Sequence, residues 1–281
     1  MKILVNPLLL ESIKIIGAKR TMLNHQKDKL NIIVVGSSHG DYGFNPKFFP
    51  ESFNLCCRSQ DLKHSFLIYK HITKNYPNIK NIVICYSIFS PGNIMENSPT
   101  EKFISPALNE FFNLGIEYED EELNFEFNKI KGRFSDVTVD SNGFMGFLPD
   151  SYKTFFPESY GAINRANDHL KFNKKIEANL FLIKFLLLAK HLQHKVCIVV
   201  PPVRSDYKKA TGGNFNVLFK SLIEITNDFY LNYDIDLING FDSNLFRDEF
   251  FGDYDHLLPL GKGTEILSRA IFNKFNGSVL E

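Results

Sequence analysis

Tryptophan is absent from this 281-residue chain, and cysteine is scarce. The four cysteines, Cys56, Cys57, Cys85 and Cys197, lie in or beside apolar runs and show neither CxxC nor zinc-ligand spacing. Thiols in such segments behave as small buried hydrophobic side chains. The pattern argues against a secreted fold held by disulfides, and we expect a reducing, cytoplasmic compartment.

A charge excess is also missing, because 32 Lys and Arg residues balance 32 Asp and Glu residues. A nucleic-acid partner would call for a basic surplus, so we expect none.

Long hydrophobic runs are missing too. The most apolar stretch, residues 180–189, includes Lys184 and has only half of the roughly 20 residues that span a bilayer. Asn6 and Pro7 interrupt the apolar start at residues 1–10, which we interpret as mature protein and not as a signal peptide.

The residues that are present suit a globular core. Hydrophobic residues make up 44% and charged residues 23%, which argues against a disordered chain, and 28 Phe with 11 Tyr supply bulky core side chains. The length fits one large domain or a domain with a sizeable insertion.

Five short apolar runs alternate with helix-like segments, a rhythm typical of a parallel sheet. The predicted strands are residues 31–35, 52–56, 81–86, 195–200 and 234–238. The predicted helices are residues 60–75, 169–193, 216–232 and 260–275. We therefore expect an α/β fold, a three-layer α/β/α sandwich around a central parallel sheet of about five strands.

The rhythm breaks between residues 91 and 166, which are rich in Asn, Ser, Gly and Phe and carry turn signals such as Pro91-Gly92. We interpret 91–166 as an insertion or lid, with loops and one or two short helices, inside a single domain that covers 1–281. Its acidic run, residues 117–122, is interpreted as a solvated face.

Ligands bind outside the carboxyl ends of parallel strands, where the sequence places three polar clusters. The first is Gly36-Ser37-Ser38-His39-Gly40, directly after a predicted strand. A serine on a strand-to-helix turn can present its hydroxyl as a nucleophile while backbone N–H groups point at the same spot. A plain polar turn, or a phosphate-binding turn at a helix N-terminus, would explain the same string.

The second cluster is Gly252-Asp253-Tyr254-Asp255-His256-Leu257. Asp253, three residues before His256, can bind the imidazole Nδ1–H and leave Nε2 free to take a proton from a serine. Asp255 is adjacent to His256, so we expect its side chain to diverge. A helix-capping loop with solvated Asp255 and His256 is the alternative.

The third cluster, residues 201–207, contains Arg204 and Tyr207, which can contact an anionic or sugar substrate. A proline-stiffened exit loop with solvated charges is the alternative. His39 is expected to orient its turn or line the pocket, and His169 to start a helix without catalytic duty. No set of His, Asp and Glu has metal-ligand spacing, so we predict neither a metal nor a cofactor.

Two of the clusters carry a resemblance to a known family. Gly36-Ser37-Ser38-His39 resembles the first block of the SGNH (GDSL-like) hydrolases, and Asp253-Tyr254-Asp255-His256 resembles their terminal DxxH block. The order of elements over residues 31–90 and 170–275 is similar to that family's flavodoxin-like fold. The resemblance implies a serine esterase or a carbohydrate O-acyltransferase.

By that resemblance Ser38 is the nucleophile, His256 the general base and Asp253 its orienting partner. The family's second block supplies a glycine whose N–H joins that of the nucleophile in the oxyanion hole. In Asn54-Leu55-Cys56-Cys57-Arg58-Ser59-Gln60 that place falls on Ser59, and Gln60 can add a contact.

The third block normally brings an asparagine after the third strand, where this chain has Phe89. Ser87, Asn93 or a residue of the insertion would have to replace that donor. Because the molecule has no net charge to steer a polyanion, an anionic substrate must be held locally, by Arg58, Arg204 or the insertion.

The leading hypothesis is acyl transfer through a seryl ester, either to water or to a sugar hydroxyl. The opening Gly36-Ser37-Ser38-His39 and the large insertion resemble bacterial proteins that modify surface polysaccharides, which implies an acetyl group and a carbohydrate. The expected partners are a small-molecule or oligosaccharide substrate and an acyl donor. A non-catalytic module that binds a carbohydrate or a phosphate is the alternative, favoured by the altered third block.

Overall fold

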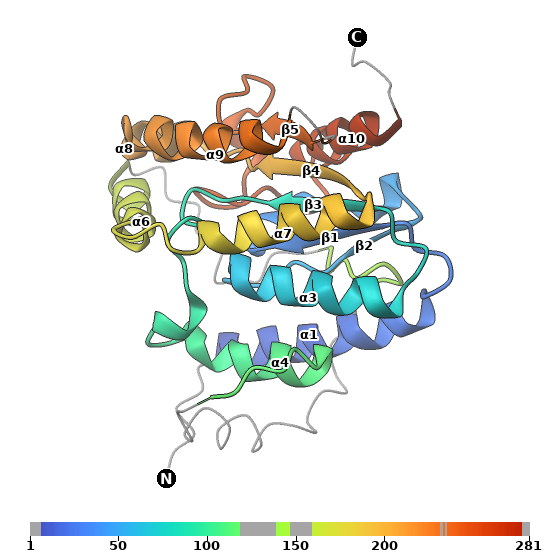
Figure 1. The fold of residues 1–281 in the computed structure, drawn as a ribbon. Coiled ribbons are helices and arrows are strands. Elements are labelled where there is room, and N and C mark those ends of the chain that lie inside the picture. The colour runs from blue at the N-terminus through green and yellow to red at the C-terminus, as the bar shows by residue number, and fades with distance from the viewer. Residues whose placement is uncertain (1–6, 119–138, 147–158, 231–232, 234, 277–281) are drawn as a thin grey trace.

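A computed structural model describes residues 7–118, 139–146, 159–230, 233 and 235–276, and Figure 1 shows its arrangement. Its centre is a five-stranded sheet in the order β2-β1-β3-β4-β5, and every neighbouring pair is parallel. The strands are β1 (Ile32–Gly36), β2 (Ser52–Asn54), β3 (Asn81–Cys85), β4 (Lys195–Val200) and β5 (Ile235–Asn239). The α/β fold class predicted from the sequence is confirmed, and this order is that of flavodoxin-like sheets.

Helices cover both faces of the sheet. They are α1 (Pro7–His25), α2 (Ser38–Gly43), α3 (Leu62–Asn75), α4 (Ser105–Phe112), α6 (Ser159–Phe172), α7 (Asn179–Leu192), α8 (Ser205–Thr211), α9 (Asn214–Tyr230) and α10 (Lys262–Asn276). Single turns of 3₁₀ helix lie at η1 (Pro46–Phe48), η2 (Met95–Asn97), η3 (Glu101–Ile104) and η5 (Asp248–Phe250).

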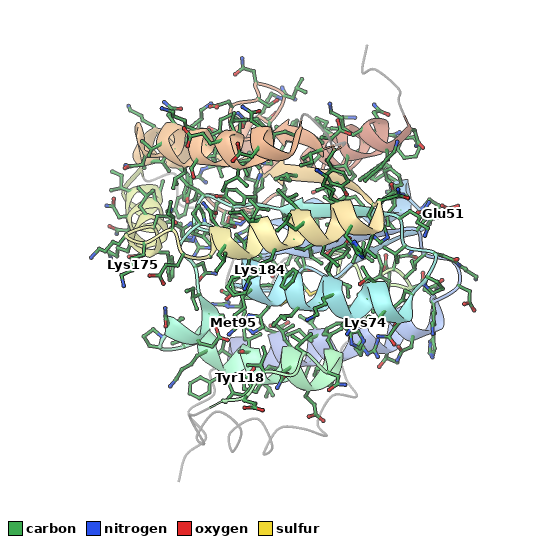
Figure 2. All side chains as sticks on the ribbon, viewed as in Figure 1. Glu51, Lys74, Met95, Tyr118, Lys175 and Lys184 are labelled. Carbon is green, nitrogen blue, oxygen red and sulfur yellow. The ribbon has the colours of Figure 1, made fainter. Side chains whose placement is uncertain are left out.

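The alternation of side chains along the strands divides the core in two. Ile33 and Val35 of β1 face a large cluster built with α3, α7 and α9, whereas Ile32 and Val34 face a smaller one built with α10. Figure 2 shows side chains filling the space between the sheet and its helices. Because every strand residue of β1 is buried, the strand is apolar throughout, which is why its run could be recognised in the sequence.

The long helix predicted over 169–193 is two helices, α6 and α7. Asn173 lies at the break, where its amide donates to the Ile88 carbonyl at 2.7 Å and accepts from the Gly92 N–H at 3.1 Å. The Ala178 N–H donates to the Pro91 carbonyl at 3.0 Å. These bonds to the loop after β3 replace the helical bonds, so tertiary contacts override the local helical pattern.

Helix α1 was not predicted, and it carries a buried cation. The Lys19 ammonium donates to Asp41 Oδ1 of α2 at 2.6 Å and to the Cys56 carbonyl at 2.7 Å. The exposed fractions of the two charged side chains are 2% and 4%. Burial raises the pKa of Asp41 although Lys19 opposes this. This ion pair joins α1 to the turn after β1 and to the segment after β2.

Part of the predicted insertion, residues 91–166, is described. It contains η2, η3, α4 and the first half of α6, while residues 119–138 and 147–158 lie outside the described residues. The acidic run at 117–122 falls largely among these. No helix among the described residues has the length and apolar character needed to cross a bilayer.

Candidate active site

The first site element is the turn between β1 and α2. Gly36 ends the strand with φ of +140°, and a Cβ there would lie 2.7 Å from Cys85, so only glycine fits. Ser37 precedes the helix and Ser38 is its first residue. The turn thus places Ser38 at the carboxyl edge of the sheet, with 7% of its surface exposed.

The second element is the loop before α10, closed by an antiparallel bridge between Phe251 and Leu257. Asp253 Oδ1 accepts from the backbone N–H groups of Asp255 at 3.0 Å and His256 at 2.7 Å. Asp253 Oδ2 lies 2.8 Å from His256 Nδ1. An ionised carboxylate only accepts, so Nδ1 carries the proton and Nε2 is left as the acceptor.

The structure brings the two elements together, because Ser38 Oγ lies 2.8 Å from His256 Nε2. A continuous path therefore runs from the Ser38 hydroxyl through the imidazole to Asp253, in the order expected from the sequence. Burial would lower the pKa of His256, but the charges of Asp253 and Asp255 raise it above its ordinary value. The arrangement can hold a proton taken from Ser38.

No hydrogen bond from the backbone N–H of Ser38 or of Ser59 is among the bonds described. Ser59 follows β2 and has φ of +55°, the left-handed conformation that glycine adopts most easily. The resemblance set Ser59 at a glycine position, and its backbone has a glycine-like conformation. Asn93 holds this residue in place by donating from Nδ2 to the Ser59 carbonyl at 3.1 Å.

The conformation of Ser59 gives a prediction. A non-glycine residue in the left-handed region costs about 1–3 kcal/mol, and a β-branched one costs most. We expect Ser59→Gly to leave the free energy of unfolding within about 1 kcal/mol of the wild type and to retain activity, because only the N–H is needed. Ser59→Val is expected to lose about 1–2 kcal/mol.

Urea denaturation and ester turnover measure these effects. Gln193, the C-terminal cap of α7 with φ of +58°, provides the matched control, because Gln193→Gly relieves the same conformation away from Ser38. A Ser59→Gly variant that folds as the wild type but has lost turnover would show that the side chain, and not the backbone, is what matters.

His39 and Ser87 meet in a hydrogen-bonded group beside the Ser38 path. His39 Nε2 lies 3.0 Å from Asp255 Oδ2, and Nδ1 faces the hydroxyls of Ser87 at 3.0 Å and Ser37 at 3.2 Å. The two hydroxyls are 2.9 Å apart. The expectation that His39 orients its turn fits this position, whereas the Ser87 hydroxyl is engaged with His39 instead of pointing to an open pocket.

Phe89, at the place of the family's third-block asparagine, packs its ring on His39 and His169, with centroid distances of 5.6 and 4.6 Å. It supplies no donor. Asn93, the other expected replacement, has its amide on the Ser59 carbonyl. The two side chains proposed as substitutes are thus bonded to protein groups, which leaves the backbone N–H groups of Ser38 and Ser59 as the donors that the resemblance implies.

The expected anion-binding arginines both have carboxylate partners. Arg58 binds Glu101 with its Nε, 3.1 Å from Oε2. Arg204 Nε donates to Asp206 at 2.8 Å, and its guanidinium lies 4.5 Å from the ring centroid of Tyr254. Neither arginine has a hydrogen bond to the Ser38 path among the bonds described.

Tyr207 and Gln60 were expected to contact substrate, but the structure buries both. Tyr207 has no exposed surface and binds His169 Nδ1 through its hydroxyl at 2.7 Å. Gln60, oriented to satisfy its neighbours, accepts from the Gly36 N–H at 3.2 Å and donates to the Leu55 carbonyl at 3.1 Å. Both side chains support the site through hydrogen bonds within the protein. Because they are buried, they offer no surface to a substrate.

Three residues that the sequence analysis did not assign to the site lie close to His256 or to one another. Asp255, expected to diverge from His256, has Oδ1 3.6 Å from His256 Nδ1. Arg165 of α6 donates from Nε to the same Oδ1 at 3.2 Å. His169, expected to start a helix, lies near the end of α6 with Nδ1 3.7 Å from Asp255 Oδ2. Local spacing gave no signal for contacts that depend on how α6 docks.

A second Ser–His–Asp path occurs in the described residues, away from Ser38. His64 Nε2 lies 2.7 Å from Ser105 Oγ, and its Nδ1 lies 2.8 Å from Asp61 Oδ1. Ser105 and His64 have no exposed surface. Asp61 also caps α3 and accepts from the Met95 N–H at 2.7 Å. This path ties η2 and α4 to α3, and its buried hydroxyl cannot meet a substrate.

Two groups of His, Asp and Glu side chains converge in the fold, although the sequence shows no metal-ligand spacing. His39, Asp255 and His256 place ligand atoms within 4.8 Å of one another, and so does a group of Asp61, His64 and Glu96. Folding joins these residues although they are far apart in sequence, and the prediction of no metal stays a prediction. Hydrogen bonds within the protein account for the convergence of the first group.

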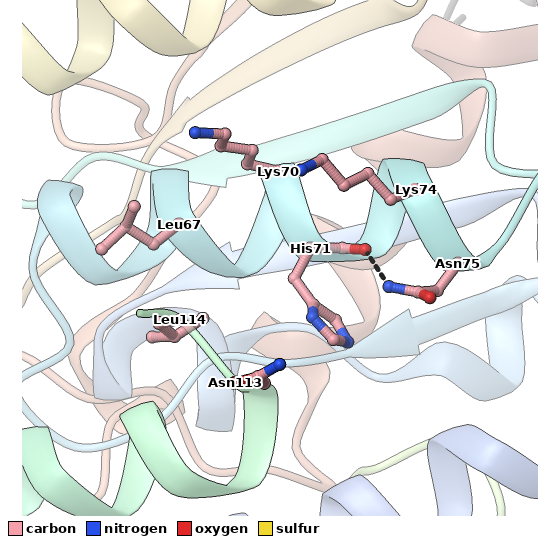
Figure 3. Close-up of a pocket in the computed structure, with 7 residues that line it drawn as sticks. All are labelled: Leu67, Lys70, His71, Lys74, Asn75, Asn113 and Leu114. Atoms are coloured by element: carbon pink, nitrogen blue, oxygen red, sulfur yellow. Dashed lines mark hydrogen bonds between the residues drawn. The ribbon is translucent and has the colours of Figure 1, made fainter. Parts of the chain in front are cut away.

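A separate pocket of about 310 Å³ lies between α3 and the end of α4 (Figure 3). Its lining residues are Leu67, Lys70, His71, Lys74, Asn75, Asn113 and Leu114. Figure 3 shows His71 pointing from α3 toward the end of α4. The lining side chains include neither a hydroxyl nor a thiol, so this pocket offers no nucleophile of the serine or cysteine type.

Comparison with known proteins gives one distant structural likeness. No family model and no curated protein matches the chain. A solved structure of "a putative platelet activating factor" from Streptococcus pneumonia is similar over 95% of this chain and 94% of that one, with 13% identity and a TM-score of 0.47. At this level the likeness carries no argument about activity or residues.

Proposed function

We propose that this protein is a serine enzyme of the SGNH type that cleaves or transfers an acyl ester. The observation that carries the proposal is the path from Ser38 Oγ to His256 Nε2 and on to Asp253, with distances of 2.8 Å at both steps. The two N–H groups without described acceptors, on Ser38 and Ser59, support it. Together they supply the nucleophile, the base, its orienting carboxylate and the oxyanion donors.

The reaction follows from these positions. Ser38 Oγ attacks the ester carbonyl while His256 Nε2 takes the hydroxyl proton, and the carbonyl oxygen becomes an oxyanion held by the N–H groups of Ser38 and Ser59. The imidazolium is stabilised by Asp253. Collapse breaks the bond to the leaving alcohol, which receives the proton from His256, and leaves an acyl group on Ser38. An incoming hydroxyl then reverses these steps.

The incoming hydroxyl decides between two activities. Water gives an esterase and a sugar hydroxyl gives an O-acyltransferase, with the same three side chains in both. The choice of a carbohydrate, with acetyl as the acyl group and a bacterial surface polysaccharide as the acceptor, rests on the resemblance of the sequence blocks alone.

Phe89 favours a second candidate, a non-catalytic module that keeps the sheet edge as a pocket for a carbohydrate or a phosphate. Loss of one oxyanion donor can cost about 3 kcal/mol of transition-state stabilisation, and Phe89 stands where the family has a donor. The intact path from Ser38 to Asp253 argues against this candidate.

The turnover of p-nitrophenyl acetate tests the proposal. We expect a burst of p-nitrophenol, stoichiometric with protein, followed by slower release as the seryl ester breaks down. For a transferase, an added oligosaccharide should accelerate the slow phase and appear in acetylated form by mass spectrometry. Release that no acceptor changes would count against a transferase, and the absence of any turnover would favour the binding module.

A further inference from the structure

Asp255 is a second carboxylate beside the imidazole of His256. Asp253 takes the Nδ1–H hydrogen bond at 2.8 Å, while Asp255 Oδ1 lies 3.6 Å from the same nitrogen. At that distance Asp255 acts on His256 through its charge and not through a hydrogen bond. Its side chain has no exposed surface, so water screens this charge weakly.

Arg165 brings the opposing charge from another element. Its Nε donates to Asp255 Oδ1 at 3.2 Å and lies 3.4 Å from Oδ2. The side chain of Arg165 is 37% exposed, whereas those of Asp255 and His256 are fully buried. The Asp255 carboxylate therefore lies between the partly exposed guanidinium of Arg165 and the buried imidazole of His256.

The other groups around His256 complete its electrostatic environment. Ser38 and the ring of His39 face it from α2, with the His39 centroid at 4.8 Å, and the Tyr42 ring lies 5.3 Å away. Asp41 of α2, paired with Lys19 of α1, also interacts with it, as does His169 of α6. Burial lowers the pKa of His39 and of His169, so both are neutral near pH 7.

We propose that Asp255 and Arg165 form a positioning pair that sets the pH range in which His256 acts as a base. Asp255 favours the imidazolium that forms when Ser38 gives up its proton, and the charge of Arg165 opposes this effect. The catalytic part of this inference rests on the proposed function, in which His256 is the general base.

The direction of each effect follows from charge. Burial would raise the pKa of Asp255, but Arg165 and the neighbouring imidazoles hold it well below its ordinary value, so Asp255 is ionised throughout the working range. Asp255 raises the pKa of His256 and Arg165 lowers it. An isosteric loss of the carboxylate and a loss of the guanidinium must therefore move the pKa of His256 in opposite directions.

Histidine-ring NMR titration of the full chain tests the pair without turnover. The His256 signal is assigned by its loss in His256→Gln. We expect its pKa to fall by about one unit or more in Asp255→Asn and to rise by a similar amount in Arg165→Gln. Arg204→Gln is the matched control, because it removes a guanidinium from a pair with Asp206 and should leave the His256 pKa unchanged.

Shifts in the same direction, or shifts no larger than that of the control, would overturn the inference. Asp255→Asn also removes the partner of His39, and if it fails to fold, Arg165→Gln alone decides: a raised His256 pKa supports the pair, and an unchanged one refutes it. A purely structural role for Arg165 would not raise the pKa of His256.

The pH profile of kcat/KM separates this inference from the proposed function. Activity needs neutral His256, so the acid limb should move to lower pH in Asp255→Asn, with about a tenfold lower plateau, and to higher pH in Arg165→Gln. Opposite NMR shifts in a protein without turnover would support the pair and refute the proposed function. Turnover whose acid limb moves in neither variant would refute the pair and leave the function standing.

Discussion

Replacing Ser38 by alanine is expected to lower the turnover of p-nitrophenyl acetate by about three to six orders of magnitude, if the proposed function holds. The physical reason is that the variant keeps the base and the backbone N–H groups but has no atom to form the acyl ester. The fold should persist, because the change removes one hydroxyl and one hydrogen bond, to His256. Steady-state kinetics, with circular dichroism as a check on folding, measure the effect.

Ser105→Ala is the matched control for that experiment. Ser105 also binds a histidine Nε2, at 2.7 Å, but has no exposed surface. We expect it to retain turnover and to lose about 1–3 kcal/mol of stability, because His64 loses a buried partner. If Ser38→Ala keeps more than a tenth of the activity, or if Ser105→Ala abolishes it in a folded protein, Ser38 is not the nucleophile.

Replacing Lys19 by methionine is expected to lower the free energy of unfolding by about 3–5 kcal/mol. The change leaves the Asp41 carboxylate, which is 4% exposed, without its cation, and it also removes the hydrogen bond to the Cys56 carbonyl. The carboxylate must then stay charged in a dry site or take up a proton, and both are unfavourable. Urea denaturation measures the loss.

Two variants control for this effect. Lys63 pairs with Glu96 at the same 2.6 Å distance but is 27% exposed, so Lys63→Met should cost no more than about 1 kcal/mol. Adding Asp41→Asn to Lys19→Met should restore part of the loss, because it removes the stranded charge. Equal losses in Lys19→Met and Lys63→Met would show that burial does not govern the strength of the Lys19 pair.

The sheet could be predicted because its strands are buried on both faces. Parallel strands under two layers of helices become continuous apolar runs, and β1 and β3 are of that kind. The contact between Asp253 and His256 could also be predicted, since a carboxylate three residues before a histidine folds back within one loop. Both signals are local in sequence, whereas the pairing of His256 with Ser38 was expected from the resemblance of the sequence blocks.

The rest depends on how distant segments dock. Lys19 is one lysine in a helix that the sequence pattern did not reveal, and its partner lies in α2. Asp255 was expected to diverge, but Asp253 Oδ1 accepts hydrogen bonds from two successive N–H groups in a tight loop, and Asp255 Oδ1 lies 3.6 Å from the imidazole. Arg165 reaches Asp255 from α6, which begins ten residues before the predicted helix and ends before Asn173, where the chain bonds to the loop after β3.

The expected substrate contacts stay predictions, and the structure gives several of these side chains partners within the protein. Arg58 and Arg204 bind Glu101 and Asp206, and Tyr207 is buried against His169. The position of a residue after a predicted strand indicates that it lies at the carboxyl edge of the sheet. It does not indicate whether a charged side chain there has already found a partner within the protein.

The most direct test of the central claim is covalent labelling of the wild-type protein with a fluorophosphonate, followed by peptide mass spectrometry. The Ser38–His256–Asp253 path predicts one adduct per chain, on Ser38, formed faster as pH rises through the pKa of His256, because only the neutral imidazole accepts the hydroxyl proton. No adduct, or an adduct on another residue that persists in Ser38→Ala, would contradict it.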